Sequence, residues 1–279
     1  MLNIKATIII LDYMKGSRVV ENVKSIMAQK IDFGIKIVVI DNSCNEENAV
    51  ILRTLAGLPN VSVRINQKNL GYIKAHNSVK NEIEGRYVMI VNPDIIWKEL
   101  DTISKMIDYM DANDGVGIIG PKQINETDGQ PAMTIRAFPK FYLQVARRTF
   151  FRNWPILNKL VSFDEMRHLD YDKIQEVDWL QSSCIVIRKS LWDNIGGLCE
   201  NYFLFMSDVE LSFQSWRNGL RVVYFPESVV YADGKRASAG GFLAFFKSWV
   251  LRQHVIDSIK YRAKHMFDGN PRQKYLSKK

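Results

Sequence analysis

The sequence predicts an α/β protein with one mainly parallel central sheet. In the first third of the chain, four short apolar runs rich in β-branched residues alternate with segments whose apolar residues recur at helical spacing. Strands that alternate with helices in this way favour parallel pairing. Polar groups directly follow three of the runs, and ligands of such sheets bind beyond the carboxyl ends of the strands. We therefore expect a ligand-binding crevice at that edge.

The expected elements follow in order along the chain. Predicted strands of the first half cover residues 6–11, 35–40, 61–65 and 87–91. Helical periodicity covers residues 17–29, 46–55, 72–83 and 101–110. The second half adds a loop over 121–139, a strand over 183–188, a helix over 208–217 and a strand over 221–225. We expect Pro226 to end that last strand, because proline cannot donate a ladder hydrogen bond.

Residues 115–120 read Gly-Val-Gly-Ile-Ile-Gly and match the G-x-G-x-x-G pattern of dinucleotide-binding turns. That fingerprint must follow a strand and open a helix. Here the segment follows a predicted helix and precedes Pro121, so we interpret it as a strand.

Length and composition limit the class of protein. The 279 residues, 47% of them hydrophobic, suffice for one large domain or a domain with an appendage. The three cysteines lack C-x-x-C spacing, which argues against a zinc site or a disulfide framework. We interpret them as free thiols in a reducing cytoplasm. No secretory signal peptide is expected, because residues 1–11 hold only a short apolar stretch with no small-residue cleavage site after it. No membrane-spanning helix is expected, since no apolar run reaches about 18 residues.

The positive charge is concentrated at the C-terminus. Residues 235–279 hold 11 Lys and Arg against two acids, a net charge of +9, which leaves −1 for residues 1–234. We expect a catalytic domain over 1–234 and a basic amphipathic helical extension over 235–279. A helix over 241–267 would place an apolar stripe on one face, formed by Phe242, Phe245, Phe246, Trp249 and Ile256. Such a helix suits an anionic membrane surface. The alternative is that the stripe packs on the domain or in a homodimer interface.

Two aspartates are candidates for chemistry. Asp94 follows a buried strand in Asn92-Pro93-Asp94, and its carboxylate suits Mg²⁺ or Mn²⁺ shared with substrate phosphates. An ordinary turn is the alternative. Asp208 follows the aromatic segment 202–206, where apolar surroundings would raise its pKa and favour a general base. The alternative is an acid that only stabilises the start of a helix.

Several short motifs occur in a fixed order along residues 6–238. They are Val39-Ile40-Asp41-Asn42-Ser43, Asn69-Leu70-Gly71-Tyr72 with Asn77, Val91-Asn92-Pro93-Asp94, Arg136-Ala137-Phe138-Pro139, Val177-Asp178-Trp179-Leu180 and the acidic segment 206–217. In order and spacing, this set resembles glycosyltransferase family 2, the inverting enzymes of the GT-A fold. The Arg136 motif is similar to one of the bacterial rhamnosyltransferase-like branch.

The resemblance implies a single Rossmann-like, nucleotide-binding GT-A domain with Asp208 as catalytic base and Asp94 as the ligand of Mg²⁺ or Mn²⁺. Binding of the donor nucleotide is implied for Tyr13, Asp41, Asn69, Gly71, Asn77 and Asn92. Contact with the acceptor or the donor sugar is implied for Trp179, Glu210 and Arg217. The implied reaction moves a sugar from a dTDP- or UDP-sugar to a hydroxyl of a lipid-linked or growing bacterial surface polysaccharide. Our best guess for the donor is dTDP-L-rhamnose.

The chain departs from the family pattern at three places. Ser207 replaces an acid before Asp208 and cannot share the base's role. Tyr231 stands where a histidine commonly follows the last strand and contacts the metal or diphosphate, so that contact is in doubt. Ser182-Ser183 replaces a Gly-Ala near the acceptor, which would change the shape of the acceptor site.

Other classes of protein remain as alternatives. A nucleotidyltransferase would need a loop rich in glycine and basic residues after the first strand, and residues 12–16 fit this poorly. A nucleic-acid-binding protein could use the basic tail, but the near-neutral body argues against nucleic acid as a partner. A non-catalytic paralogue would account for Ser207 and Tyr231. For the enzyme we expect a cytoplasmic location, peripheral to the inner face of the plasma membrane.

Overall fold

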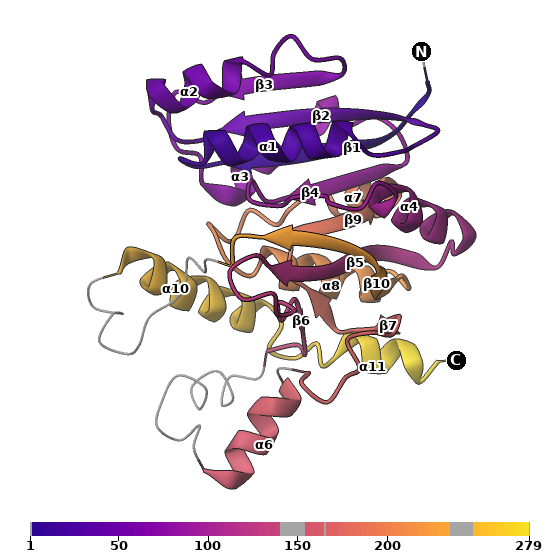
Figure 1. Cartoon of the computed structure of the whole chain (residues 1–279). Coiled ribbons are helices and arrows are strands. Elements are labelled where there is room, and N and C mark those ends of the chain that lie inside the picture. Colours follow the sequence, from indigo (N-terminus) through magenta and orange to yellow (C-terminus); the bar gives the residue numbers. More distant parts are fainter. Residues whose placement is uncertain (1, 140–153, 165, 235–247, 279) are drawn as a thin grey trace.

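The computed structural model describes residues 2–139, 154–164, 166–234 and 248–278, and its centre is an eight-stranded sheet with the order β3-β2-β1-β4-β9-β5-β10-β7 (Figure 1). The strands are β1 (Ile4–Asp12), β2 (Gly34–Asp41), β3 (Val61–Ile65), β4 (Tyr87–Val91), β5 (Val116–Asn125), β7 (Gln175–Glu176), β9 (Cys184–Arg188) and β10 (Arg221–Ala232). Only β9 and β7 run antiparallel to their neighbours. The predicted α/β fold with a mainly parallel sheet is confirmed.

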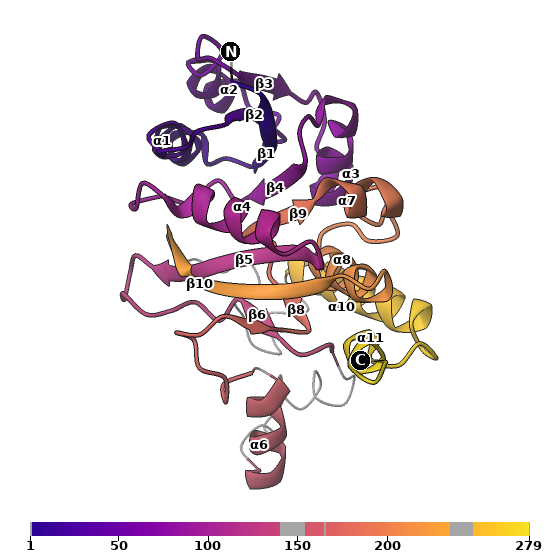
Figure 2. The same cartoon turned by 90° about the vertical axis from the view of Figure 1, so that its right-hand side faces the viewer.

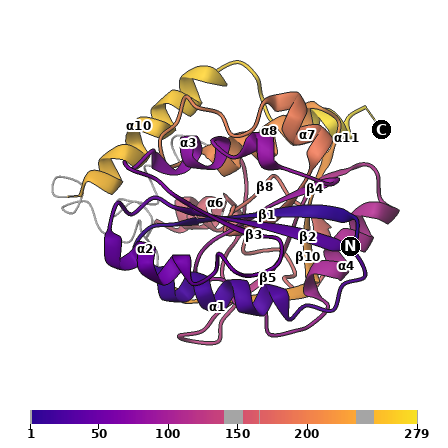
Figure 3. The same cartoon turned by 90° about the horizontal axis from the view of Figure 1, so that it is seen from above.

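Helices cover both faces of this sheet (Figures 2 and 3). One face carries α1 (Gly16–Met27), α2 (Glu46–Arg53) and α4 (Thr102–Ala112). The other carries α3 (Gly71–Asn77), α7 (Lys189–Ile195), α8 (Ser207–Arg217), α10 (Trp249–Lys264) and α11 (Pro271–Leu276). A 3₁₀ turn (Lys80–Glu82), α6 (Pro155–Asp164) and the small sheet of β6 (Ile135–Arg136) and β8 (Trp179–Leu180) complete the described elements.

The apolar runs of the sequence serve two hydrophobic cores. Ile8 and Ile10 of β1 belong to the core under α1, together with Val19. Ile9 belongs to the core on the opposite face, together with Ile73 of α3. Successive side chains of a strand point to opposite faces, so a strand covered on both sides must be apolar without interruption.

In the second half of the chain, one predicted strand is confirmed and the predicted end of another is wrong. The glycine-rich run lies in β5, as expected, and Gly117 allows close packing: a Cβ atom there would lie 2.4 Å from the Ser215 side chain of α8. The expected end of the last strand at Pro226 was wrong, because β10 continues to Ala232. Its register against β5 shifts between Phe225 and Val229, and this irregularity accommodates the proline.

The C-terminal helices pack on the body of the protein. α10 begins after Ser248, whose hydroxyl accepts the Leu251 N–H, and it buries Leu251, Asp257 and Tyr261. Trp249 and Ile256 of the predicted stripe are about half exposed, at 50% and 46%. Phe242, Phe245 and Phe246 lie outside the described residues. The inner face of the tail helix is therefore part of a core. Within the described residues, no helix has the length and apolarity that a membrane crossing requires.

Candidate active site

The carboxyl ends of β1 and β2 bring two buried aspartates side by side. Asp12 and Asp41 are register partners, and the Asn48 side chain donates to both, at 2.6 Å and 3.1 Å. Burial raises the pKa of Asp12. Asp41 Oδ1 also accepts the Ser43 N–H at 2.9 Å, whereas its Oδ2 is buried without a hydrogen-bond partner among the described residues. A ligand N–H would satisfy this oxygen.

A tight turn lies beside these aspartates. The Asn69 side chain accepts the Gly71 N–H at 2.8 Å and an N–H of the Asn42 side chain at 2.8 Å. Gly71 has φ +76°, a conformation that side-chain-bearing residues rarely adopt. Tyr13 lies at the same edge with 60% of its surface exposed. Tyr13, Asp41, Asn69 and Gly71, which the sequence predicted at the donor nucleotide, are thus gathered at one edge of the sheet.

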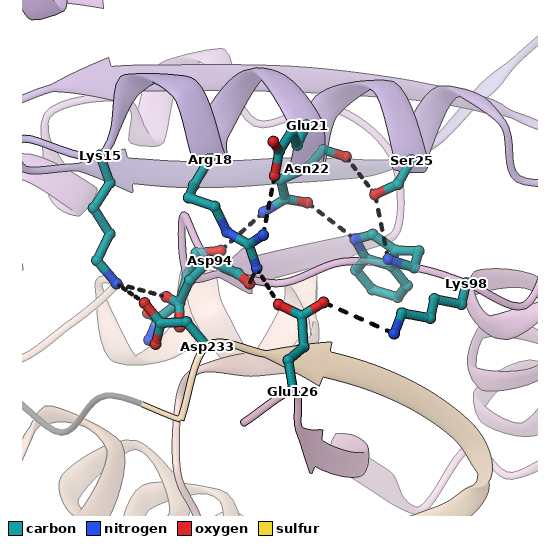
Figure 4. A network of polar contacts seen from close by, with 11 residues as sticks. Lys15, Arg18, Glu21, Asn22, Ser25, Asp94, Lys98, Glu126 and Asp233 are labelled. Atoms are coloured by element: carbon teal, nitrogen blue, oxygen red, sulfur yellow. Dashed lines mark hydrogen bonds and ion pairs between the residues drawn. The ribbon is translucent and has the colours of Figure 1, made fainter. Parts of the chain in front are cut away.

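Asp94 has a carboxylate neighbour that the sequence did not predict. The Lys15 ammonium lies 3.4 Å from Asp94 Oδ1 and 3.0 Å from Asp233 Oδ2, so it links the loop after β4 to the end of β10 (Figure 4). Burial raises the pKa of Asp94, and Asp233 adds to the rise while Lys15 opposes it. Two carboxylates face the single charge of Lys15 and supply hard oxygen donors. This donor set fits Mg²⁺ or Mn²⁺.

Helix α1 holds the loop of Asp94 in place (Figure 4). The Arg18 guanidinium donates to the Asp94 carbonyl at 3.1 Å and to Glu126 at 2.6 Å. The Asn22 side chain donates to the Asn92 carbonyl at 2.9 Å. Asn92 thereby contributes to the position of the loop through its backbone. Tyr231, which stands where the family pattern commonly has a histidine, has its ring 3.8 Å from the Lys98 ammonium.

Asp208 opens α8 at the same edge of the sheet. The Asn92 N–H donates to the Ser183 carbonyl at 2.7 Å, which places the Ser182-Ser183 turn beside the Asp94 loop. Asp208 lies against the Ser182 backbone N–H, and its Oδ1 accepts the Val209 N–H at 2.9 Å. Burial raises the pKa of Asp208 to about 6. Asp208 remains partly accessible, and a pKa near 6 suits a carboxylate that must accept a proton near neutral pH.

The match to protein families agrees with this geometry. Residues 5–248 match the model of the family described as "Glycosyltransferase like family 2". The chain belongs to this glycosyltransferase family. The predicted membership and the GT-A type of fold are thereby confirmed.

Two relatives carry assigned names. N-acetylglucosaminyl-diphospho-decaprenol L-rhamnosyltransferase of Mycobacterium tuberculosis is 28% identical over 183 residues, 62% of this chain and 58% of that protein. Low-salt glycan biosynthesis hexosyltransferase Agl10 of Haloferax volcanii is 24% identical over 225 residues, 77% of this chain and 63% of that protein. The chain thus spans less than two thirds of either relative.

Solved structures share the fold. The mannosyltransferase PcManGT of Pyrobaculum calidifontis, solved with GDP-mannose and Mn²⁺, aligns with TM-score 0.62 at 16% identity over 98% of this chain and 69% of that chain. GalNAc-T7, solved with UDP, GalNAc and Mn²⁺, aligns with TM-score 0.63 at 14% identity over 99% of this chain and 56% of that chain. At these identities the likeness concerns the fold alone.

Four residues predicted for this glycosyltransferase site have other partners. The Asn77 amide bonds the Leu198 N–H and carbonyl, at 2.9 Å and 2.8 Å, and so holds the turn after α7. The Trp179 indole donates to the Ala137 carbonyl at 2.8 Å. Arg217 lies at the far end of α8, 3.8 Å from Asp268. The structure does not place Asn77 or Arg217 beside Asp94 and Asp208.

Glu210 is the fourth of these residues. Its oxygens bond the Lys264 ammonium at 2.7 Å, His265 Nε2 at 2.6 Å, the Gln214 amide at 2.7 Å and the Tyr202 hydroxyl at 3.0 Å. Burial opposes its ionisation, but these hydrogen bonds outweigh burial and lower its pKa to about 2. Both oxygens are occupied, so Glu210 ties α8 to the C-terminal helix. A sugar would have to displace these partners to reach it.

Proposed function

We propose that this chain is a metal-dependent inverting glycosyltransferase that moves a sugar from a nucleotide donor to a hydroxyl of a lipid-linked or growing surface polysaccharide. One observation carries the proposal. A partly accessible carboxylate with a raised pKa, Asp208, lies against the Ser182-Ser183 turn, and that turn neighbours the loop of Asp94, whose carboxylate pairs with Asp233 around Lys15. A base for the acceptor and oxygen ligands for a cation at the diphosphate are the two groups that a direct displacement needs.

In the proposed reaction, Asp208 accepts the proton of the acceptor hydroxyl while that oxygen attacks the anomeric carbon of the donor. The bond between this carbon and the diphosphate oxygen breaks, and its electron pair leaves with the nucleotide diphosphate. Attack from the face opposite the leaving group inverts the anomeric configuration. Asp94 and Asp233 would hold Mg²⁺ or Mn²⁺, which neutralises charge on the departing diphosphate when bound. Lys15 would be available to the same phosphates.

The donor we favour is a pyrimidine nucleotide sugar, with dTDP-L-rhamnose as the best guess. Asp41 Oδ2 is a buried acceptor that the base N–H of uracil or thymine would satisfy. The exposed Tyr13 ring is available to stack on that base. The sugar assignment is supported by the Arg136 motif and by the mycobacterial relative named as an L-rhamnosyltransferase.

We also propose that α10 rests on the anionic inner surface of the plasma membrane. Its outer face exposes the apolar residues Trp249, Ile256 and Ile259, and the segment 235–279 carries a net charge of +9. Aromatic and aliphatic groups beside Lys and Arg suit a lipid interface. This placement would bring the active site close to a lipid-linked acceptor.

The test is a panel of nucleotide sugars incubated with the protein and Mn²⁺, with released nucleotide diphosphate measured. We expect dTDP-L-rhamnose or a UDP-sugar to be turned over, and chelation or Asp94→Asn to abolish turnover. Asp128→Asn, at an exposed loop acid that accepts the Gln130 N–H, is the matched control and should keep full activity. Full activity in chelator, or in Asp94→Asn, would refute the role of the metal. A protein that releases no diphosphate from any donor would refute the proposed function.

A further inference from the structure

A buried carboxylate of the C-terminal helix binds the backbone that leads into α8. Asp257 is fully buried, and it accepts the N–H groups of three consecutive residues. The distances to its nearest oxygens are 3.2 Å from Phe203 N, 3.1 Å from Leu204 N and 2.9 Å from Phe205 N. Gln253, on the same helix, donates to Asp257 Oδ1 at 2.9 Å. We call residues 202–206 the base loop, because it leads into the first turn of α8, which holds Ser207 and Asp208.

The chemistry of this contact is specific. Three backbone N–H groups that converge on one point bind an anion as a nest does. A buried carboxylate is tolerated only where charge-assisted hydrogen bonds replace its hydration. The base loop is therefore fixed by a residue that is more than 50 positions further along the chain. Without Asp257, its three N–H groups would lose their acceptor.

The base loop also touches the turn that is predicted to bind the donor nucleotide. A Cβ atom on Gly71 would lie 2.8 Å from the Phe203 ring, so this ring packs directly over the turn of Asn69 and Gly71. On its other side the Phe203 ring meets Trp249 of α10 edge-on, at 5.4 Å between ring centroids. Phe205 packs on His254 of the same helix at 4.5 Å. The loop thus lies between the predicted nucleotide turn and the C-terminal helix.

We propose that Asp257 is a positioning residue, through which the C-terminal helix fixes the base loop and holds Asp208 in its buried environment. The basic tail is then a part of the active site and not an appendage to it. This inference rests on the proposed role of Asp208 as base. Asp257 itself does not touch the reacting atoms.

A second contact between the tail and the body makes it possible to distinguish positioning of the base loop by Asp257 from simple anchoring of α10. Glu210 ties Lys264 and His265 to α8, and it also accepts the hydroxyl of Tyr202, the first residue of the base loop. Loss of Asp257 leaves that contact intact, so the helix stays docked while the base loop loses its acceptor. Anchoring alone predicts a loss of stability, whereas positioning predicts a change at Asp208.

The experiment titrates Asp208 by ¹³C NMR of aspartate carboxyl carbons in the full-length protein, with Asp208→Asn to assign the signal. In the wild type we expect a pKa of about 6. In Asp257→Ala, water reaches the loosened base loop, burial weakens, and the pKa falls toward the ordinary value of about 4. Asp257→Asn keeps one acceptor oxygen and should lie between the two. Ser258→Ala is the matched control, because among the described residues that hydroxyl bonds only to His254 of the same helix.

Hydrogen exchange and turnover complete the test. The amides of residues 203–205 should exchange faster in Asp257→Ala and Asp257→Asn, but not in Ser258→Ala. Turnover at saturating dTDP-L-rhamnose should fall about 10–100-fold in Asp257→Ala, as expected when a reacting group is misplaced by about 1 Å. An unchanged Asp208 titration in a folded Asp257 variant would overturn the proposal. If Asp257→Ala does not fold, Asp257→Asn decides. A wild type without turnover refutes the proposed function, while titration and exchange still test Asp257.

Discussion

Two acids on different faces of α8 have pKa values that are shifted in opposite directions. Asp208 and Glu210 are two residues apart on one helix, and residues at this spacing do not face each other. Asp208 turns toward Ser182, where burial raises its pKa to about 6. Glu210 turns toward α10, where hydrogen bonds from His265 and Lys264 outweigh burial and lower its pKa to about 2. The difference teaches that the neighbours of an acid, and not its place in a motif, decide in which direction its pKa is shifted.

The largest expected effect concerns turnover. Asp208→Asn keeps the size of the side chain but loses proton affinity, so turnover at saturating donor should fall about 10²–10⁴-fold. Glu210→Gln removes a charge that already has protein partners, and turnover of its folded fraction should change far less. Both variants are compared with wild type in one assay with melting controls. If Asp208→Asn is active and Glu210→Gln is inactive, the comparison is reversed, and the base is Glu210 and not Asp208.

Stability should respond with opposite signs at neutral pH. Glu210→Gln leaves His265 and Lys264 without their shared anion and should lower the free energy of unfolding by about 3 kcal/mol. The pKa of Asp208 is raised above its ordinary value, so its ionised form destabilises the folded state. Asp208→Asn should therefore raise the free energy of unfolding, on the order of 1 kcal/mol. Thermal or urea unfolding of both variants measures this.

The control is the pH dependence of the deficit, by which we mean the free energy of unfolding that Glu210→Gln loses relative to the wild type. A lowered Glu210 pKa contributes stability above its ordinary value of about 4.5, and this is lost as the pH falls toward about 2. Burial opposes a charged His265, but hydrogen bonds with Glu210 and Asp268 raise its pKa. Its contribution is complete below about 6.5 and is lost as the pH rises through the raised pKa. The deficit should be largest between about pH 4.5 and 6.5. A deficit that keeps growing above that window would contradict this pairing.

The sequence predicted those parts of the site that directly follow a recognisable strand of the parallel sheet. Asp12, Asp41 and Asp94 each follow an apolar run, and parallel pairing brings such ends together. Asp208 was predicted because it follows the aromatic segment 202–206 and because the acidic segment 206–217 resembles that of the family. Asp233 could not be found in this way, because its partner Asp94 is far away in sequence and the expected end at Pro226 hid the rest of β10.

The C-terminal tail is a second region whose role the sequence could predict only in part. Its apolar stripe was interpreted as a membrane-binding face or as a packed one, and periodicity cannot distinguish the two. Within α10 the only acid is Asp257, and its partners in the body of the protein are the backbone N–H groups of residues 203–205. Backbone groups leave no signature in the sequence. An isolated acid within a basic amphipathic helix is the one signal that could have indicated a buried contact.

The smallest expected effect concerns Asp41 at the end of β2, a third carboxylate to which the comparison of the two α8 acids can be extended. Glu210 has both oxygens bonded, whereas Asp41 has one bonded oxygen and one buried oxygen without a partner among the described residues. In Asp41→Asn, the Ser43 N–H and Asn48 still require an acceptor, which turns the new NH₂ group toward the nucleotide base. The NH₂ group of the variant then faces the N–H of uracil, so that two donors meet without an acceptor. UDP affinity should fall about 10-fold, because one charge-assisted hydrogen bond is lost. Cytosine presents an acceptor at that position, so CDP should gain relative to UDP. Calorimetry with UDP, dTDP, CDP and GDP measures both effects. Wild-type protein that binds GDP more tightly than UDP and dTDP, or an Asp41→Asn variant with unchanged preference, would mean that Asp41 does not contact the base.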